Sequence, residues 1–392
     1  MSTIYLDNAA TTQISPFVLD EMLPYLKDHY GNPSSSHSLG IEARKAKEAA
    51  REKVASLIGA EPDEVFFTSG ATESNNWIIN VVCKGLGDFT YFATSSVEHK
   101  SVLAPISLCG NYVSNDPSVV EVDKNGRTEV EEFSSLFDKH GFSTSFTSII
   151  YANNEIGAIM DVEGLCKIAH DNVCLFHTDA TQAIPHMKIN VKQLKVDAMS
   201  GSAHKLYGPK GVGFLYVNKY SPLYRLVQKN GMILGGGQEF GYRAGTENVP
   251  GIVGLGAACE ETKVFLGDKG NEQRLNRMAS DLLERLKESV GAVLNVSEET
   301  KRVPTLSVWI PGVNNQELIQ LLNEEGVCVS SGSACNEGEG KPSHVLSAIG
   351  LDKERINETI RISIGRNNTE EDIKTACEVI EDKVNILKIF NS

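Results

Sequence analysis

The sequence predicts an α/β protein with a large domain built on a mostly parallel sheet and a second, smaller α+β domain. Helical stretches alternate with short runs of β-forming residues from about residue 40 to residue 250, which is typical of a sheet covered by helices on both faces. Beyond about residue 260 the pattern changes to longer charged helices, one strand and a Gly/Ser-rich segment. This change in character predicts the second domain.

The individual elements are predicted from local periodicity and residue type. The charged, Ala-rich stretch 41–57 predicts a helix. Short apolar runs rich in β-branched and aromatic residues predict strands. These runs are residues 65–68, 89–94, 147–151, 173–177, 196–200 and 213–217 in the first part and residues 305–310 in the second. A final helix is expected after Thr369.

The composition is that of a globular protein of two or three domains, because 392 residues exceed the ~150 typical of one domain. No apolar run approaches the ~20 residues of a membrane span. The 51 acidic residues outnumber the 37 basic ones, and the net charge of -14 repels phosphate backbones and anionic membranes. We therefore expect no direct nucleic-acid partner and no membrane association. Because the first residues resemble no leader peptide, a cytoplasmic location is expected.

Eight cysteines are scattered along the chain without a CxxC pair, a pattern that argues against a disulfide framework and against a metal site. They are Cys83, Cys109, Cys166, Cys174, Cys259, Cys328, Cys335 and Cys377. Most are expected to be small buried hydrophobic residues. Cys335 differs because it lies among small and polar residues in the stretch SSGSACNEGEGK, a setting that favours a thiolate nucleophile over a packing residue.

Polar clusters follow five of the six strands predicted in the first part. They are residues 69–73, 97–100, 153–155, 178–180 and 202–205. In open parallel sheets, ligands bind outside the carboxyl ends of the strands. The five clusters therefore predict one shared site.

Three of these clusters contain groups that suit a phosphate-bearing cofactor bound as a Schiff base. Free amides at the helix start after residues 69–73 can bind phosphate, although these residues are also typical of an ordinary turn between a strand and a helix. Lys205 ends a strand, where desolvation favours the neutral amine of a Schiff-base lysine, but most loop lysines are simply solvated. Asp179 can bind a pyridine nitrogen, or it can cap a helix.

Other polar residues offer supporting roles that the pattern alone leaves open. His99 can stack on a ring or transfer a proton, and Gln182 and Asn154 can hydrogen-bond a cofactor or a substrate. Arg361 and Arg366 lie in a strand-like stretch, and either guanidinium can bind a substrate carboxylate or form a structural ion pair.

Together these features resemble the NifS/IscS-type cysteine desulfurases, which belong to the class V aminotransferase-like, fold-type I enzymes that use pyridoxal phosphate. The resemblance covers nearly the whole chain and includes GATESNN at 70–76 and SSGSAC at 330–335. The other matching stretches are residues 5–12, 31–35, 98–100, 153–157, 177–180, 204–205, 235–239, 243–246 and 361–366. The resemblance implies a seven-stranded sheet in a large domain of residues 16–260 and a small domain formed by residues 1–15 and 261–392.

The resemblance also implies a role for each site residue. Lys205 would carry the coenzyme, Asp179 would hold its ring nitrogen and His99 would lie over the ring. The remaining cofactor contacts would come from Ala71, Thr72, Asn154, Gln182, Ser202, Ala203, His204 and, from the neighbouring subunit of a homodimer, Thr246. Arg361, Asn154 and Asn32 would bind the substrate.

The reaction implied by the resemblance removes sulfur from L-cysteine. The Lys205 amine would take the Cα proton, the Cys335 thiolate would attack the substrate sulfur, and alanine and a Cys335 persulfide would result. An iron–sulfur scaffold protein is the expected acceptor of the sulfur, with tRNA thiolation as a further use. The segment 336–341 resembles the longer loop of the IscS-like group, whereas the short C-terminus favours a NifS-like assignment.

Two other interpretations use the same residues. The first is another reaction on this fold, by a selenocysteine lyase, an aminotransferase or a kynureninase-like hydrolase, because fold and cofactor do not fix the reaction. A transaminase, however, has no use for a thiol such as Cys335. The second is a non-catalytic sulfur carrier, which would not need Lys205, Asp179 and Arg361.

Overall fold

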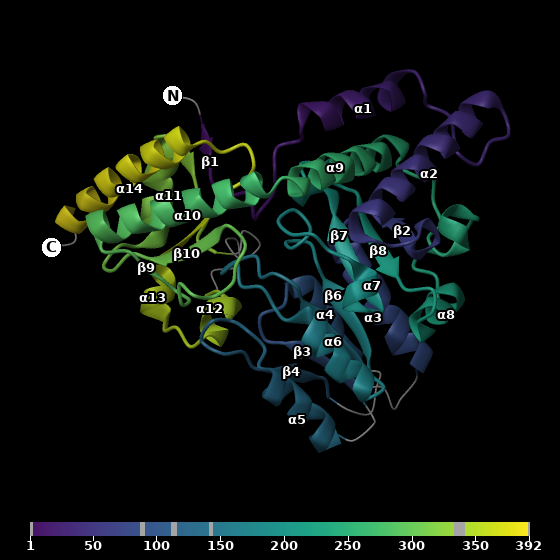
Figure 1. The fold of residues 1–392 in the computed structure, drawn as a ribbon, viewed down its shortest axis with the longest axis horizontal. Helices are drawn as coiled ribbons and strands as arrows, with labels where there is room; N and C mark the ends of the chain where they lie inside the picture. The colour runs from purple at the N-terminus through teal and green to yellow at the C-terminus, as the bar shows by residue number, and fades with distance from the viewer. Residues whose placement is uncertain (1–2, 87–90, 111–115, 141–143, 333–341, 391–392) are drawn as a thin grey trace.

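A computed structural model gives the fold of the chain and describes residues 3–86, 91–110, 116–140, 144–332 and 342–390 (Figure 1). Two groups of elements lie side by side, one around a large sheet and the other around a small one. Helix α9, Val249–Gly267, belongs to the larger group, and α10, Lys269–Val290, belongs to the smaller one. Helix α9 runs continuously through residue 260, so no break between elements marks a domain boundary there. The predicted division of the chain at residue 260 stays a prediction.

The large sheet has seven strands in the order β2-β8-β7-β6-β5-β3-β4. Strand β8 is antiparallel to both of its neighbours, and the other neighbouring pairs are parallel. The strands are β2 Val65–Thr68, β3 Tyr91–Ser95, β4 Ser118–Val120, β5 Thr144–Ile150, β6 Leu175–Asp179, β7 Ala198–Ser202 and β8 Gly213–Val217. The expected mostly parallel, seven-stranded sheet is therefore confirmed.

Helices cover both faces of this sheet because side chains alternate along each strand. In β2, Phe66 packs into the hydrophobic cluster on one face, while Val65 and Phe67 belong to the cluster on the other. The first face is covered by α3 Ala71–Leu86, α4 Lys100–Cys109 and α8 Pro222–Lys229. The second is covered by α2 Ser38–Ile58, α5 Val130–His140, α6 Val162–Asp171, α7 Val191–Leu194 and α9.

Helix α9 lies between α2 and α1, Pro16–Lys27, and small residues allow this close approach (Figure 1). A Cβ atom on Gly256 of α9 would lie only 2.7 Å from the Cα atom of Ala50 in α2. Real Cβ atoms do not approach a backbone atom so closely, so glycine is required where the two helices touch.

The smaller group contains a three-stranded antiparallel sheet in the order β12-β10-β9 and a parallel pair of β1 with β11. The strands are β1 Ile4–Tyr5, β9 Val293–Leu294, β10 Thr305–Trp309, β11 Val327–Cys328 and β12 Thr359–Ser363. The helices are α10, α11 Asn315–Glu324, α12 His344–Ala348, α13 Lys353–Asn357 and α14 Glu370–Phe390. Because β1 pairs with β11, the amino-terminal segment joins this α+β group.

Most predicted elements lie close to their observed bounds, but β5 begins three residues earlier than predicted, and β6 and β7 each begin two residues later. Polar residues of both strands find partners across the sheet, including Thr178 beyond the predicted end of β6, whose Oγ1 donates to the Ile149 carbonyl in β5 at 2.8 Å. His177 in β6 is fully buried, and its two ring nitrogens hydrogen-bond Ser148 Oγ in β5 at 2.8 Å and Ser200 Oγ in β7 at 2.9 Å. Strand β4 was not predicted at all.

A buried ion pair fixes the Gly-rich segment after α8 to the edge of the large sheet. The Arg51 guanidinium donates two hydrogen bonds to the Glu239 carboxylate, at 2.6 and 2.9 Å, and the backbone amide of Phe67 donates to the same carboxylate at 2.8 Å. Glu239 and Phe240 both have positive φ angles, of 45° and 60°, which residues other than glycine rarely adopt. The pair therefore holds a strained turn in place.

We expect Arg51→Ala to lower the free energy of unfolding by about 3 kcal/mol, because it leaves the buried Glu239 carboxylate without its bidentate partner. The Nζ atom of Lys47, 3.7 Å from Glu239, compensates only in part. Guanidinium denaturation measures the change. Lys167→Ala, which breaks an exposed ion pair with Asp171 on α6, is the matched control and should leave the midpoint nearly unchanged. Equal losses in the two variants would contradict a stabilising role for the buried pair.

Candidate active site

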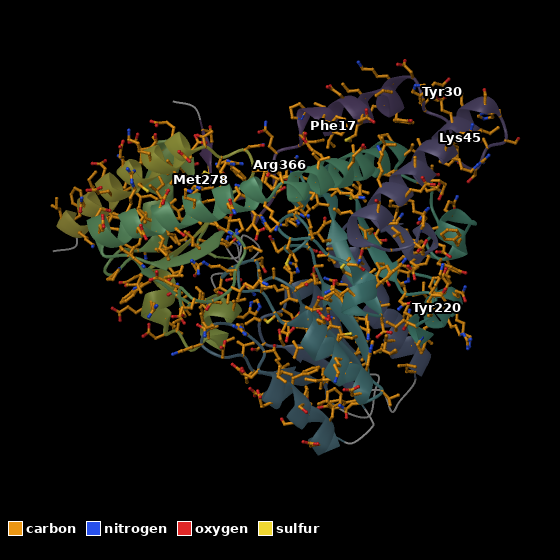
Figure 2. All side chains as sticks on the ribbon, viewed as in Figure 1. Phe17, Tyr30, Lys45, Tyr220, Met278 and Arg366 are labelled. Carbon is orange, nitrogen blue, oxygen red and sulfur yellow. The ribbon has the colours of Figure 1, made fainter. Side chains whose placement is uncertain are left out.

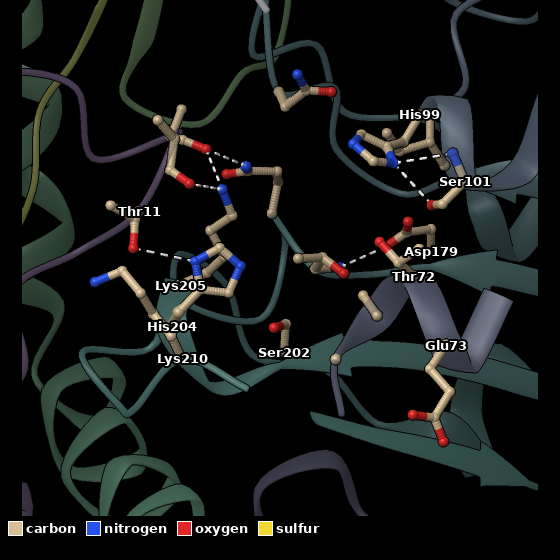
Figure 3. Close-up of a pocket in the computed structure, with 18 of the residues that line it drawn as sticks. Thr11, Thr72, Glu73, His99, Ser101, Asp179, Ser202, His204, Lys205 and Lys210 are labelled. Atoms are coloured by element: carbon tan, nitrogen blue, oxygen red, sulfur yellow. Dashed lines mark hydrogen bonds between the residues drawn. The ribbon is translucent and has the colours of Figure 1, made fainter. Parts of the chain in front are cut away.

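A cavity of about 520 Å³ opens at the edge of the sheet where β2, β3, β5, β6 and β7 end (Figure 3). Its walls come from the residues at or just after these strand ends, from residues 9–11 and from Arg361 of β12. This is the edge at which the sequence predicts one shared site.

The cavity brings together ten of the residues expected in the site. They are Ala71, Thr72, His99, Asn154, Asp179, Gln182, Ser202, His204, Lys205 and Arg361. Ala203 is buried next to them without lining the cavity, and Asn32 and Thr246 are exposed elsewhere on the chain. Cys335 lies outside the described residues. The roles of all these residues stay predictions.

The start of α3 forms one end of the cavity and suits a phosphate group. The first amides of a helix have no acceptor inside it, and they lie at the positive end of the helix dipole. Here these amides follow Gly70, whose φ of +154° favours glycine, and Ser202 and Lys210 line the same cavity. A hydroxyl, a lysine and free amides together match the donors that a phosphate monoester needs.

His204 also lines this region and is held in place by Thr11. Its Nδ1 lies 3.1 Å from Thr11 Oγ1. Burial lowers the pKa of His204 to about 4, and the nearby charges of Lys205 and Lys210 act in the same direction. The ring is therefore neutral at neutral pH and contributes hydrogen bonds rather than charge.

Lys205 lines the cavity, and its amine is hydrogen-bonded at one side of it (Figure 3). It follows β7 in the short turn η3, Ala203–Lys205, and Nζ donates to the carbonyl oxygens of Ala9 and, at 2.5 Å, of Ala10. Gln182 Nε2 donates to the same Ala9 carbonyl at 2.8 Å. The amino-terminal segment therefore forms the wall against which this amine lies.

Asp179, the last residue of β6, lines the cavity and is almost completely buried. Its Oδ2 accepts a hydrogen bond from Asn75 Nδ2 at 2.8 Å, and its Oδ1 accepts one from the Thr181 amide at 3.0 Å. A carboxylate fixed in this way suits a protonated pyridine nitrogen.

Arg361 is the arginine of the cavity. Its guanidinium is buried, with Nη2 donating to Asp7 Oδ1 at 2.6 Å and Nη1 to the Asn154 carbonyl at 3.1 Å. Nε has no hydrogen-bond partner among the described residues. Arg366 instead pairs with Glu261 of α9 at 2.5 Å and lies over the Tyr207 ring, near the junction of α9 and α10 (Figure 2). Of the two arginines, Arg361 is therefore the one that lines the cavity.

Several residues that build this site have no role assigned to them by the sequence pattern. Asn75 and Ser101 contact Asp179 and His99, and the Ala9 and Ala10 carbonyls receive the Lys205 amine. Alanines at a chain start carry no signal of a backbone acceptor. Asn75 is visible in the sequence only as a polar residue within a helical stretch, which is not specific.

The part of the chain that the structure describes contains neither a cluster of possible metal ligands nor a membrane-spanning helix. No group of three or more His, Cys, Asp or Glu side chains there is arranged to hold a metal ion. Within those same ranges, no helix is both long enough and apolar enough to cross a membrane.

The fold and the cavity define an α/β protein of the enzyme type, with its candidate site at the carboxyl edge of a parallel sheet. The family model described as aminotransferase class-V matches residues 4–375. The chain belongs to this family.

Named relatives cover nearly the whole chain. This chain is 40% identical over 390 residues to cysteine desulfurase IscS of Dictyoglomus turgidum, and the alignment covers 99% of this chain and 96% of the relative. The corresponding protein of Methanosarcina thermophila is 38% identical over 386 residues, covering 98% and 93%. A solved structure described as a NifS-like protein has a TM-score of 0.88 at 37% identity, covering 98% of this chain and 100% of that one. SspA in complex with cysteine has a TM-score of 0.79 at 33% identity, covering 93% and 99%.

Next to the site, Glu98 is a carboxyl group buried without full hydrogen bonding. Its Oε1 accepts from Ser95 Oγ at 2.6 Å and from the Ile150 amide at 2.7 Å, whereas Oε2 has no partner among the described residues. Burial raises the pKa of Glu98 to about 8, and the charge of Asp179 acts in the same direction. The folded protein therefore holds this proton up to about pH 8, whereas the unfolded chain releases it near the ordinary pKa of ~4.3.

Because the folded state binds the extra proton, the contribution of Glu98 to stability is present at low pH and is lost as the pH rises through about 8. We expect Glu98→Gln, which cannot ionise, to become more stable relative to the wild type as the pH rises from about 5 to about 9. Chemical denaturation at several pH values measures the difference. Glu132→Gln on the exposed side of α5 is the control and should show a constant difference. A constant difference for Glu98→Gln as well would contradict the assignment.

Proposed function

We propose that this protein is a cysteine desulfurase that uses pyridoxal phosphate. It removes sulfur from L-cysteine, releases L-alanine and holds the sulfur as a persulfide on Cys335. The proposal rests mainly on one observation. A single cavity is lined by the Lys205 amine, the Asp179 carboxylate, the start of α3 and the Arg361 guanidinium. The relatives that carry the name cysteine desulfurase support this choice among the reactions of the family.

The cavity fits the coenzyme in the chemistry of its donors. Amides at the start of α3, with Ser202 and His204, would hold the phosphate, and Asp179 would hold the ring nitrogen. Gln182 would reach the ring hydroxyl, and His99 would lie over the ring. When bound, pyridoxal phosphate draws electrons from the Cα atom of an attached amino acid and so makes the Cα proton removable.

The residues of the chain would orient the substrate and move its proton. The Arg361 guanidinium, which lines the cavity, would bind the cysteine carboxylate, while Asp7 and the Asn154 carbonyl keep it oriented. The Lys205 Nζ atom, close to the same volume, would then take the Cα proton. We extend the substrate contacts to the Asn154 side chain and to Asn32, which on its own chain is exposed.

The thiolate of Cys335 would attack the sulfur atom of the substrate. A new S–S bond forms, the bond between Cβ and sulfur breaks, and its electron pair stays on the carbon fragment, which is protonated to alanine. The persulfide then passes to an acceptor. We propose an iron–sulfur scaffold protein as the acceptor, with tRNA thiolation as a further destination of the sulfur. SspA, which was solved with cysteine, supports cysteine as the substrate.

We also propose a homodimer in which Thr246 reaches the phosphate site of the neighbouring subunit. Thr246 is exposed and does not line the cavity of its own chain. It follows a segment that exposes Leu234 and Phe240, and exposed apolar side chains of this size are typical of an interface. Arg243 ties the segment to Glu73 at 2.7 Å, beside the cavity.

The proposed location is the cytoplasm. All seven cysteines that the structure describes are free thiols, which fits a reducing compartment. A catalytic thiol such as Cys335 also needs that compartment in order to stay reduced between turnovers.

Mixing the purified protein with cysteine and a reductant, and measuring alanine and sulfide together, tests the reaction. The wild type should be yellow and release both products in equal amounts. Cys335→Ser should lose sulfide release and keep the colour, because Cys335 does not hold the coenzyme, whereas Lys205→Ala should lose the normal visible spectrum and turnover. Cys328→Ser, which changes the half-buried thiol of β11, is the matched control and should keep its activity. Full activity of Cys335→Ser would rule out the proposed nucleophile, and a colourless wild type would rule out the cofactor.

Replacing Arg361 tests the carboxylate site. We expect Arg361→Gln to reduce kcat/KM for cysteine roughly 10- to 100-fold, mostly through a higher KM, because a charge-assisted hydrogen bond to the carboxylate is lost. The visible spectrum should not change. Arg366→Gln, which removes the arginine paired with Glu261, should leave KM for cysteine close to that of the wild type. A larger effect on KM in Arg366→Gln than in Arg361→Gln would reverse the assignment.

A further inference from the structure

A chain of hydrogen bonds joins His99 to Asp179 through two residues to which the sequence pattern assigns no role. Asn75 in α3 is fully buried, and its Nδ2 donates to Ser101 Oγ at 2.9 Å and to Asp179 Oδ2 at 2.8 Å. Ser101 Oγ lies 2.7 Å from His99 Nδ1. The backbone amide of Ser101 donates to the same Nδ1 at 3.1 Å, so that His99 caps the start of α4. His99, Ser101 and Asp179 all face the cavity (Figure 3).

The direction of each bond in this chain is fixed by what its atoms can do. A backbone amide can only donate, so His99 Nδ1 carries no hydrogen. An ionised carboxylate can only accept, so Asn75 must present its nitrogen, and not its oxygen, to Asp179. The same nitrogen then donates to Ser101 Oγ, and the Ser101 hydroxyl is left to donate its own hydrogen to His99 Nδ1. The one hydrogen of the neutral His99 ring is therefore on Nε2.

We propose that Asn75 and Ser101 are positioning residues that hold His99 as the neutral tautomer with its hydrogen on Nε2 and tie the His99 ring to the Asp179 carboxylate. The functional importance of this chain of hydrogen bonds rests on the proposed function, in which His99 lies over the coenzyme ring and Asp179 binds the ring nitrogen. The bond chain itself involves only residues of this protein. Asn75 Oδ1 is buried and has no partner among the described residues, so Asn75 serves the site through its two donor bonds.

This arrangement limits what His99 can do in the cavity. With Nδ1 occupied by two donors, the ring presents an Nε2–H donor and an aromatic face to a bound group. It gains a second proton only by losing the bond from the Ser101 amide and reversing the bond from the Ser101 hydroxyl. Burial also lowers the pKa of His99; the charge of Asp179 opposes this effect, whereas Lys205, His344 and Lys100 add to it. His99 therefore acts as a neutral donor, and proton removal from the substrate falls to another group.

Nitrogen NMR of protein labelled with ¹⁵N in its histidine rings tests the tautomer, with the coenzyme-loaded protein and with the protein stripped of coenzyme. Comparison with His99→Gln identifies the His99 signals. At neutral pH we expect two distinct ring nitrogens, with Nδ1 in the range of a nitrogen without hydrogen and Nε2 in the range of a nitrogen that carries one. A hydrogen on Nδ1, or two equivalent nitrogens, would overturn the proposal. Because this readout needs no turnover, a wild type without cysteine desulfurase activity would overturn the proposed function separately.

Variants at both positions test whether Asn75 acts through the Ser101 hydroxyl. Ser101→Ala removes one donor to Nδ1, and Asn75→Ala frees the hydroxyl to turn away from it. Since a hydrogen bond to the neutral form lowers a pKa, each variant should raise the pKa of His99, by roughly 0.5–1 unit. The double variant should raise it no further, because both changes act on one hydroxyl. Additive shifts, or no shift in either single variant, would overturn the proposal.

Two more variants separate this positioning role from a general loss of structure. Ser101→Thr keeps the hydroxyl and should restore the His99 signals of the wild type. Asn76→Ala removes the same side chain one position along α3, where Nδ2 donates to the backbone carbonyls of Thr72 and Ser101, and should leave His99 unchanged. If Asn75→Ala does not fold, the comparison of Ser101→Ala with Ser101→Thr decides the question. Equal His99 signals in those two variants would contradict the proposal.

Discussion

The common direction of β2, β3, β5, β6 and β7 is the constraint on which the candidate site depends. Because these strands point the same way, their carboxyl ends meet at one edge of the sheet, and the residues that follow them enter one cavity. Strand β8, which runs the other way between β2 and β7, begins at this edge, and Lys210 and Gly211 just before it also line the cavity. Groups that are more than a hundred residues apart in sequence are thus held together by backbone hydrogen bonds, and no contact between site side chains is needed to gather them.

Burial at this edge then determines which groups carry charge. The pKa of both His99 and His204 is lowered mainly because burial disfavours the charged ring, and the same cause raises the pKa of Glu98. Asp179 and Arg361 are buried as well, but each has oppositely polarised partners, two N–H donors for the carboxylate and Asp7 with a carbonyl for the guanidinium. The cavity therefore combines neutral imidazole rings with a fixed carboxylate and a fixed guanidinium, and the Lys205 and Lys210 amines line the same volume.

Local patterns in the sequence predicted what local chemistry decides. The bounds of β2 and β8 followed from apolar runs, and the shared edge followed from the polar clusters after the strands. The continuation of β6 beyond residue 177 was not predictable in this way, because the polar Thr178 side chain is accommodated by the Ile149 carbonyl on the neighbouring strand. The contacts of Asn75 were hidden for the same reason, since Ser101 and Asp179 lie 26 and 104 residues away. The sequence pattern also could not distinguish Arg361 from Arg366, because only the fold decides which guanidinium lines the cavity.

The amino-terminal segment connects the two groups of elements and brings their contributions to the site into one frame. Its first strand pairs with β11, and the Leu6 carbonyl accepts the amide of Ser363 at the end of β12. A few residues later, the Ala9 and Ala10 carbonyls receive the Lys205 amine from the large sheet. One short stretch of backbone thus touches both the strand that carries Arg361 and the amine of Lys205. The distance between the group expected to bind the substrate carboxylate and the group expected to take its Cα proton is therefore set by this segment rather than by the boundary between the two parts of the chain.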